Sequence, residues 1–459
     1  MCTRSSAAEV LPTPGVSVRE ITVSPRGPHR GVLSKTGRFL REIAGVPLLV
    51  MLGFTFLTTV CLVADQTTSV GFLNGMRRLA GQVVGPDAAT SALQGIATGL
   101  VTVTSITFSV LLLAVQQTAS NLSPVVFDQF IRRKSNQAFL GFFVGLALFA
   151  YVVMAAVKKD TPPILGATVA TGLTVVALVI LLVLVYSTVA QMRPTSVIRV
   201  IHDRALAARD DETRLVARTR RAPRRAHDVA VRARVDGTGY VTHIDADLLG
   251  RAVRGMDDIE VHLHVTTGDH LCHGDVLLSV RAADVDRAAD VAAQAAAALT
   301  ISSQRDLAHD PTTGVDELGN IAWSSGSTSK QNPEVARQAL HALEDLAVRW
   351  LTEDSTEGAD VWPVVYPDND SHRLIDVLYS LLVVAQESHQ ELFGAAVLDS
   401  YTHLLHRSPA LRDRWADDLP AIDDLVEHMP PSRRLRQAHE AFRRALHEQS
   451  IGAITPVAM

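Results

Sequence analysis

Residues 91–120, SALQGIATGLVTVTSITFSVLLLAVQQTAS, constrain the fold more than any other segment because they contain no charged side chain. As a helix rising about 1.5 Å per residue, the segment is roughly 45 Å long, which exceeds the ~30 Å hydrocarbon core of a bilayer. Its polar residues recur at helical spacing on one face: Thr98, Thr102, Ser105, Ser109, Gln116 and Ser120. Lipid tails offer no hydrogen-bond partners to the polar side chains of such a face. We therefore predict a membrane span whose polar stripe meets protein or water.

Three further apolar segments, at residues 43–64, 139–157 and 164–192, are long enough to cross a bilayer. The chain is 47% hydrophobic and 20% charged, because these apolar segments precede residue 193 whereas most acidic residues follow it. We predict a mainly α fold, in which a four-span transmembrane helical domain is followed by a cytoplasmic α+β region. That region is expected to contain a small β half-barrel module and then an α-helical domain.

Basic residues flank the four spans unequally. On one side of the membrane lie Lys35, Arg38, Arg41, Arg132, Arg133, Lys134, Arg193, Arg199, Arg204 and Arg209, whereas the opposite loops hold only Arg77, Arg78, Lys158 and Lys159. By the positive-inside rule, this predicts a multi-pass protein of the cell membrane with both termini cytoplasmic. The basic flanks are expected to contact anionic lipid headgroups.

Small residues in two spans are spaced for close helix packing. Gly95 and Gly99 in the second span, and Gly141 and Gly145 in the third, form G-x-x-x-G pairs. Such pairs let helix backbones approach closely, either inside one four-helix bundle, which we favour, or between copies of a homo-oligomer. No charged residue or histidine lies in the middle of any span, which argues against proton-coupled transport and voltage sensing.

Composition divides the chain into five regions. We predict a flexible basic arm at residues 1–40, the transmembrane domain at 41–193 and a basic linker helix at 194–235. A small β module follows at 236–282 and a helical domain at 283–459. The helices of the last region are expected at residues 285–300, 314–322, 333–352, 372–405, 421–427 and 432–448.

Several segments carry a resemblance to a known family. They include SITFSVLLLAVQQTASNLSP at residues 105–124, QAFLGFFVGLALFAYVV at 137–153, TTGDHLCHGDVLLSV at 266–280 and QRDLAHDPTTGVDELGNIA at 304–322. Their order and spacing resemble the bacterial predicted membrane proteins called domain of unknown function 2254, over residues 43 to 405. The resemblance implies residence in a membrane and supplies no activity. At residues 327–333 the chain has STSKQNP where the family tends to carry S-P-G-x-N-D-P.

The β module also resembles the half-barrel of biotinyl and lipoyl carrier domains, which present a modified lysine. No lysine occurs in residues 236–282, so a carrier role is excluded. The module does contain imidazole and thiol groups, and a hairpin can bring four of them together as a metal site: His262, His264, His270 and Cys272. Their spacing matches no established zinc motif, and hydrogen-bonded strand histidines are the favoured alternative. No other cofactor is predicted.

Two polar clusters further along the chain invite a functional interpretation. Arg305, Asp306, His309 and Asp310 precede Pro311, and an ion-paired turn capping the next helix is favoured over an active site. The acidic run at residues 368–370 lacks the glycine and distal glutamate of a calcium loop. Phosphate-binding, nucleophile-elbow, zinc-protease and dinucleotide motifs do not occur, so the chain is not predicted to be an enzyme.

Two functional hypotheses follow from these observations. The first is a homo-oligomeric ion channel or pore, lined by the hydroxyl and amide groups of the second span and gated by the cytoplasmic region. The second is a membrane-anchored sensor or scaffold without transport activity, in which the polar stripe holds helices together. Lipid and further copies of the chain are the expected partners, and nucleic acid is not expected.

Overall fold

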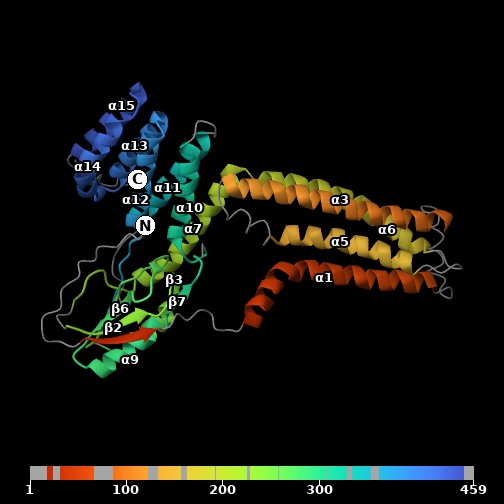
Figure 1. Cartoon of the computed structure of the whole chain (residues 1–459), viewed down its shortest axis with the longest axis horizontal. Helices are drawn as coiled ribbons and strands as arrows, with labels where there is room; N and C mark the ends of the chain where they lie inside the picture. Colours follow the sequence, from red (N-terminus) through yellow and green to blue (C-terminus); the bar gives the residue numbers. More distant parts are fainter. Residues whose placement is uncertain are drawn as a thin grey trace, which may run out of the picture. The chain divides into compact units, whose positions relative to one another are not determined.

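The computed structural model describes residues 18–23, 32–66, 86–121, 133–156, 163–191, 193–224, 228–256, 258–305, 308–327, 333–352 and 361–448. The chain divides into two compact units. We call residues 30–197 the membrane unit, and residues 1–29 with 198–459 the α/β unit. Figure 1 labels most elements of the two units.

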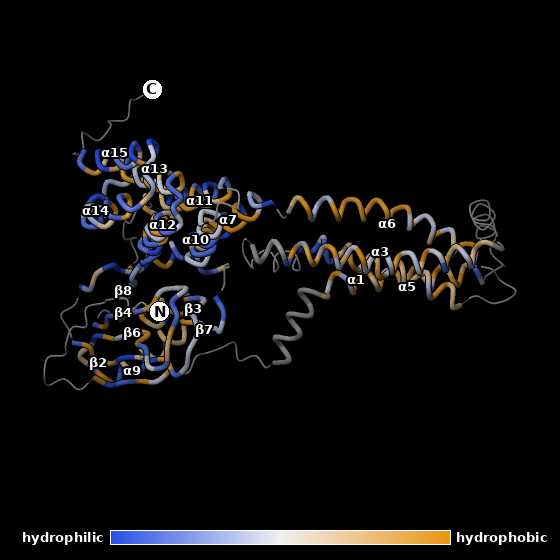
Figure 2. Tube along the Cα trace, turned by 45° about the horizontal axis from the view of Figure 1, so that its top comes forward, coloured by the Kyte–Doolittle hydropathy of each residue, from blue (hydrophilic) through white to orange (hydrophobic). Residues whose placement is uncertain are grey.

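The membrane unit consists of long apolar helices: α1 (Val32–Gln66), α3 (Pro86–Asn121), α5 (Lys134–Ala155) and α6 (Ile164–Gln191). Each contains a stretch of 22 to 24 residues that is apolar and long enough to cross a bilayer. Figure 2 shows that these helices are predominantly hydrophobic along their length. The four predicted spans are thereby confirmed. The connection at residues 122–132 lies outside the described residues.

Helix α5 is the central helix of the membrane unit and packs against α1, α3 and α6. Its glycines determine how closely α1 approaches. A Cβ atom on Gly141 would lie 2.8 Å from Pro47 Cα, and one on Gly145 would lie 2.4 Å from the Phe54 ring. The Phe54 and Phe142 rings meet edge to face at 5.4 Å. One G-x-x-x-G pair of the sequence therefore lies inside the unit, in the contact between α1 and α5.

The end of α1 is tied to the start of α6 by a buried carboxylate. Asp65 is 4% exposed and accepts hydrogen bonds of 3.1 Å from the backbone N–H groups of Leu165 and Gly166. The first N–H groups of a helix have no partner within the helix, and a carboxylate satisfies both of them and opposes the helix dipole. This contact fixes the relative position of two spans at one end of the unit.

The α/β unit contains two small sheets. The first has the order β1 (Arg19–Val23), β2 (Val229–Val235), β6 (Val276–Arg281), β4 (Glu260–Leu263) and β8 (Val364–Val365). The second has the order β5 (His270–Leu271), β3 (Gly239–Ile244) and β7 (Leu299–Ser302). Helix α9 (Val285–Ala296) packs on β1, β2 and β6, and α8 (Ala246–Val253) packs beside α9. Fully buried side chains such as Val261 and Leu278 form the core of this region.

The helices of the α/β unit begin with α7 (Pro194–Val216), which follows the last span. The others are α10 (Pro311–Gly326), α11 (Pro333–Thr352), α12 (Asp370–Glu387), α13 (Glu391–Arg407), α14 (Leu411–Glu427) and α15 (Arg433–His447). Tyr401 and Trp415 stack at 4.8 Å, and both rings meet Phe442 edge to face, which joins α13, α14 and α15 in one aromatic core.

The structure differs from the sequence prediction in several places. The linker helix predicted at 194–235 ends at Val216, and residues 229–235 form β2. The helix predicted at 421–427 begins ten residues earlier, at Leu411. Residues 19–23 of the arm predicted to be flexible form a strand, which pairs in parallel with β2. The helix predicted at 285–300 ends at Ala296, because its last residues enter β7. The helix predicted at 372–405 is two helices, separated at His389, whose φ is +54°. The β module extends beyond 236–282, because β1, β2, β7 and β8 complete its sheets.

The contact at Gly141 predicts that Gly141→Ala destabilises the membrane unit. The added methyl group would overlap the backbone of α1 at Pro47, which cannot move aside as a side chain can. We expect a loss of about 1–3 kcal/mol and a lower melting temperature of the purified protein in detergent. Gly172→Ala is the matched control, because no atom lies within 4 Å of its added Cβ. Equal melting temperatures for both variants would contradict this packing.

Candidate functional site

The polar stripe of α3 lies on the surface of the membrane unit and not inside its bundle. Thr98, Thr102, Ser105, Ser109 and Gln116 are all exposed in the single chain. The opposite face of α3 is buried against α5 and α6 through residues such as Leu93, Ala97 and Val115, each 0% exposed. A helical rotation of about 100° per residue sets the stripe roughly opposite that buried face. The side chain of Ser120 lies outside the described residues.

The second G-x-x-x-G pair lies beside this stripe. Gly95 and Gly99 are exposed, and a Cβ atom on either glycine would meet no atom within 4 Å. Their counterparts on α5, by contrast, are in close contact with α1. The two glycine pairs, which are indistinguishable in sequence, thus have different environments. The pair on α3 leaves a surface that another helix backbone can approach closely.

Some of the hydroxyl groups on this surface already have partners within α3. Thr102 Oγ1 donates to the carbonyl of Thr98 at 2.9 Å, and Ser109 Oγ donates to the carbonyl of Ser105 at 2.8 Å. A hydroxyl bonded to the preceding turn tolerates an apolar neighbour better than an unbonded one, and it keeps its acceptor lone pairs. The stripe can therefore face either a helix or water. Its assignment as a pore lining stays a prediction.

The four residues predicted as metal ligands lie on or directly after strands of two different sheets. His262 lies in β4 of the five-stranded sheet, with its Nε2 atom 2.6 Å from Glu260 Oε1. His264 follows the end of β4, and its Nε2 atom is 2.9 Å from Ser279 Oγ on β6. His270 lies in β5, which pairs with β3 in the three-stranded sheet, and its Nδ1 is 3.9 Å from Cys272 Sγ. No three His, Cys, Asp or Glu side chains among the described residues are grouped as a metal site. The separation arises because the chain leaves the first sheet after β4.

The cluster before Pro311 forms the ion-paired turn that the sequence favoured. Arg305 donates to Asp310 Oδ2 at 2.8 Å, to Asp316 Oδ2 at 2.5 Å and to Thr312 Oγ1 at 2.5 Å. Asp310 is fully buried and caps α10 by accepting from the N–H of Thr313. A Cβ atom on Gly268 would lie 2.7 Å from Asp310 Oδ2, so the turn after β4 packs directly on this cap.

A second network, on α7, was missed by the sequence analysis. Arg209 is 3% exposed, and its guanidinium donates to both carboxylate oxygens of Asp368 at 2.8 Å and to Asp370 Oδ2 at 3.0 Å. Its Cζ atom lies 5.6 Å from the centroid of the Trp350 ring. A bidentate guanidinium–carboxylate pair over an aromatic face is a strong, directional contact. The acidic run at residues 368–370 thus binds an internal arginine.

A further acid, Glu212, completes this network, which holds more carboxyl groups than one guanidinium can neutralise. Glu212 lies one turn from Arg209 on α7, next to Asp370, and accepts a hydrogen bond from the buried Tyr366 hydroxyl. Burial and the neighbouring Glu212 carboxyl raise the pKa of Asp370 well above its usual range, and burial raises the pKa of Glu212. Asp368, held by Arg209, has a lowered pKa despite its burial. The pair of Glu212 and Asp370 therefore loses its last proton at a higher pH than Asp368 loses its own.

The sequence contains only a weak signal for this network. Arg209 and Glu212 are three residues apart on a helix, the spacing at which side chains share a face, but the surrounding sequence is rich in exposed charge. Their partners lie about 160 residues further along the chain, beyond the reach of local patterns. Only the contacts of Arg209 and Glu212 with residues 366–370 show that this face of α7 is internal.

These features define a multi-pass membrane protein in which four candidate spans are followed by an α/β unit with buried charge networks. A family model described as "Predicted membrane protein (DUF2254)" matches residues 41–382, which is most of the chain. The chain therefore belongs to the DUF2254 family of membrane proteins, and the family resemblance predicted from the sequence is confirmed. Neither the curated proteins nor the solved structures contain a match to the chain.

The buried acid pair predicts how stability depends on pH. Because the pKa of Asp370 is raised in the folded chain, the folded state binds more protons than the unfolded state above the ordinary carboxyl pKa of about 4. The stabilising contribution is present below that pH and is lost as pH rises through the folded pKa, at up to about 1.4 kcal/mol per pH unit for one proton. We expect Asp370→Asn to flatten the fall in melting temperature between pH 5 and pH 8.

Asp345→Asn is the control for this measurement. The pKa of Asp345 is lowered, against the effect of its partial burial, by its hydrogen bonds to Arg349 and His202. Its own contribution therefore changes below about pH 4. The control is made in a His202→Gln background, which removes the imidazole that contacts Asp345, and there Asp345→Asn should leave the slope between pH 5 and pH 8 unchanged. The melting temperatures are measured by near-ultraviolet circular dichroism. Identical slopes of melting temperature against pH for the wild type and Asp370→Asn would contradict the raised pKa of Asp370.

Proposed function

We propose that the protein is a homo-oligomeric ion channel or pore of the cell membrane, in which the polar faces of α3 from several copies line a conduit. The observation that carries the proposal is the exposure of all five described stripe residues on the surface of the membrane unit. A conduit within one chain would require these side chains to face the interior of the bundle. In this arrangement the conduit requires several copies around a shared axis.

The cost of leaving the stripe in lipid supports assembly. An exposed amide such as that of Gln116 lacks hydrogen-bond partners among acyl chains, whereas a neighbouring copy or water supplies them. Gly95 and Gly99 lie next to the stripe and give adjacent α3 helices room for close contact. The hydroxyl and amide groups can then replace part of the hydration shell of a small ion without any buried charge.

The remaining parts of the proposal concern topology and gating. We place both termini and the α/β unit on the cytoplasmic side, because the basic flanks follow the positive-inside rule, and we expect these flanks to contact anionic lipid headgroups. Helix α7 follows the last span directly, so a change in the α/β unit has a covalent route to the spans. The proposal includes no enzymatic reaction.

A second candidate function is a membrane-anchored sensor or scaffold without conduction. The hydrogen bonds from Thr102 and Ser109 to their own helix favour it, because such hydroxyls suit dry contact between helices. In this alternative the same faces of α3 meet, but they leave no conduit. A channel and a scaffold that both assemble through α3 would both be oligomers. Ion flux distinguishes the two candidates.

We predict that Gly99→Leu weakens self-association. The larger side chain would occupy the surface that allows a neighbouring α3 to approach closely. The measurement is the mass of the detergent-solubilised protein by light scattering, with a shift from oligomer towards monomer as the expected result. Gly172→Leu, on the exposed side of α6, is the matched control and should leave the mass unchanged. A monomeric wild type would exclude the proposed assembly.

We predict ion flux from purified protein in liposomes, and a reduced flux for Ser105→Leu or Ser109→Leu. Each substitution replaces a hydroxyl with an apolar side chain, which raises the barrier for a hydrated ion in a narrow conduit. The control is Val179→Leu on α6, an apolar residue that is 59% exposed and lies outside the stripe. An intact oligomer with no flux above empty vesicles, across gradients of common ions, would contradict the channel and favour the scaffold.

A further inference from the structure

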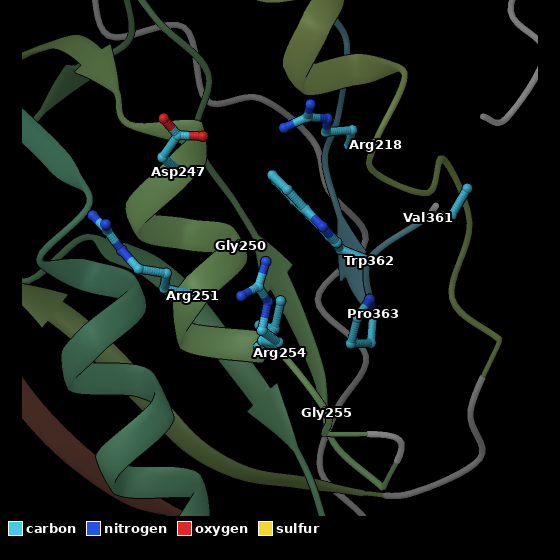
Figure 3. Close-up of a pocket in the computed structure, with 10 residues that line it drawn as sticks. Arg218, Asp247, Gly250, Arg251, Arg254, Gly255, Val361, Trp362 and Pro363 are labelled. Carbon is cyan, nitrogen blue, oxygen red and sulfur yellow. The ribbon is translucent and has the colours of Figure 1, made fainter. Parts of the chain in front are cut away.

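The α/β unit contains a cavity of about 550 Å³ that no part of the proposed function uses. Its wall combines the end of the segment after α7, the helix α8 and the residues that precede β8 (Figure 3). Arginine dominates the lining through Arg218, Arg251 and Arg254, with Asp247 as the one acidic residue among the lining residues that the structure describes. The volume is within the range of small-molecule sites, roughly 300–1,000 Å³.

The arginines of this cavity are available to a ligand. No carboxylate among the described residues forms an ion pair with Arg218, Arg251 or Arg254. This distinguishes them from the arginines of the two networks above, each of which is held by at least two acids. Three guanidinium groups around one cavity, with a single carboxylate among the described lining residues, favour the binding of an anion.

Trp362 orients one of these arginines. The Arg218 Cζ atom lies 5.4 Å from the centroid of the Trp362 ring, close enough for a cation–π contact. The two backbones are joined, because the N–H of Trp362 donates to the carbonyl of Arg218 at 2.8 Å. The N–H of Arg220 donates in turn to the carbonyl of Val364 at 2.7 Å. The guanidinium is thereby placed over the ring before any ligand binds, which lowers the entropy lost on binding.

Helix α8 supports the other side of the ring. A Cβ atom on Gly250 would lie 2.5 Å from Trp362 Cζ2, so the absence of a side chain lets the indole lie directly against the helix. Figure 3 shows Trp362 between Arg218 and Gly250, with Arg254 nearby, directly after the end of α8. Asp245 caps α8 by accepting from the N–H of Leu248, which stabilises the helix that carries Asp247 and Arg251 and that ends just before Arg254.

We propose that this arginine–tryptophan cavity binds a small phosphorylated anion, with Arg218 and Arg254 contacting the phosphate oxygens. The planar guanidinium matches phosphate in a bidentate geometry, and several arginines suit a group of more than one negative charge. The same chemistry is offered by a soluble phosphate compound and by the phosphate of a lipid headgroup. The inference is independent of ion conduction, because it concerns only the α/β unit.

The test uses the full-length protein in phosphatidylcholine nanodiscs, with pyrophosphate as the probe. Pyrophosphate binding is measured by calorimetry and by tryptophan fluorescence. The contribution of Trp362 is the difference between the fluorescence changes of the wild type and of Trp362→Phe. We expect a saturable, Trp362-dependent change, with affinity reduced roughly 10-fold or more in Arg218→Gln and in Arg254→Gln. The control is Arg436→Gln, which removes an exposed arginine of α15 and should leave the affinity unchanged. The melting temperature of each variant verifies that it is folded.

The lipid composition of the nanodiscs distinguishes the two sources of phosphate. If the occupant is a lipid headgroup, discs of phosphatidylglycerol should produce the Trp362-dependent change without pyrophosphate, and Arg218→Gln should abolish it. If the occupant is soluble, the change should require pyrophosphate in both kinds of disc. Either result supports the site.

Two results would overturn the inference. One is the absence of a Trp362-dependent signal in both lipids, together with no calorimetric binding of pyrophosphate at millimolar concentration. The other is an equal loss of affinity in Arg436→Gln and in the cavity variants, which would assign the binding to general surface charge. If general surface charge binds the pyrophosphate, a folded Gly250→Ala variant, in which Trp362 is displaced, would bind pyrophosphate with the affinity of the wild type.

Discussion

The close approach of α1 to α5 at Gly141 and Gly145 determines the arrangement of the membrane unit. Helices in lipid associate through packing and not through the hydrophobic effect, so small residues at a contact have a large influence. With α1, α3 and α6 all packed on α5, the apolar face of α3 is used inside the unit. The polar face of α3 is consequently directed outward. The possibility of an assembly built on α3 depends on this arrangement.

Charge is distributed differently in the α/β unit. Arg209 and Arg305 are each satisfied by two carboxylates, and removal of either arginine would leave buried negative charge without compensation. These networks join segments that are distant in sequence, such as α7 and the residues before α12. The arginines around Trp362 have no such partners among the described residues, although they belong to the same unit. The contrast separates structural arginines from a cavity suited to an anion.

Local patterns were sufficient for the spans and for several soluble helices. An uncharged run of bilayer length has few alternatives, and α11 was predicted with its observed limits because Pro333 begins the helix. The candidate metal site could not be judged in this way. His262 lies in β4 and His264 directly follows it, but the sheet that contains His270 is decided by a pairing with Tyr240, 30 residues away in sequence. Short-range periodicity contains no information about such pairings.

The sequence by itself determined that this chain is a four-span membrane protein of the DUF2254 family, because hydropathy and ordered motifs are local properties. The tertiary structure alone decided which glycine pair is buried, which arginines are paired and which side of α3 is exposed. These outcomes depend on contacts between segments far apart in the chain. Identical local motifs, such as the two G-x-x-x-G pairs, acquire different roles only when their neighbours are placed.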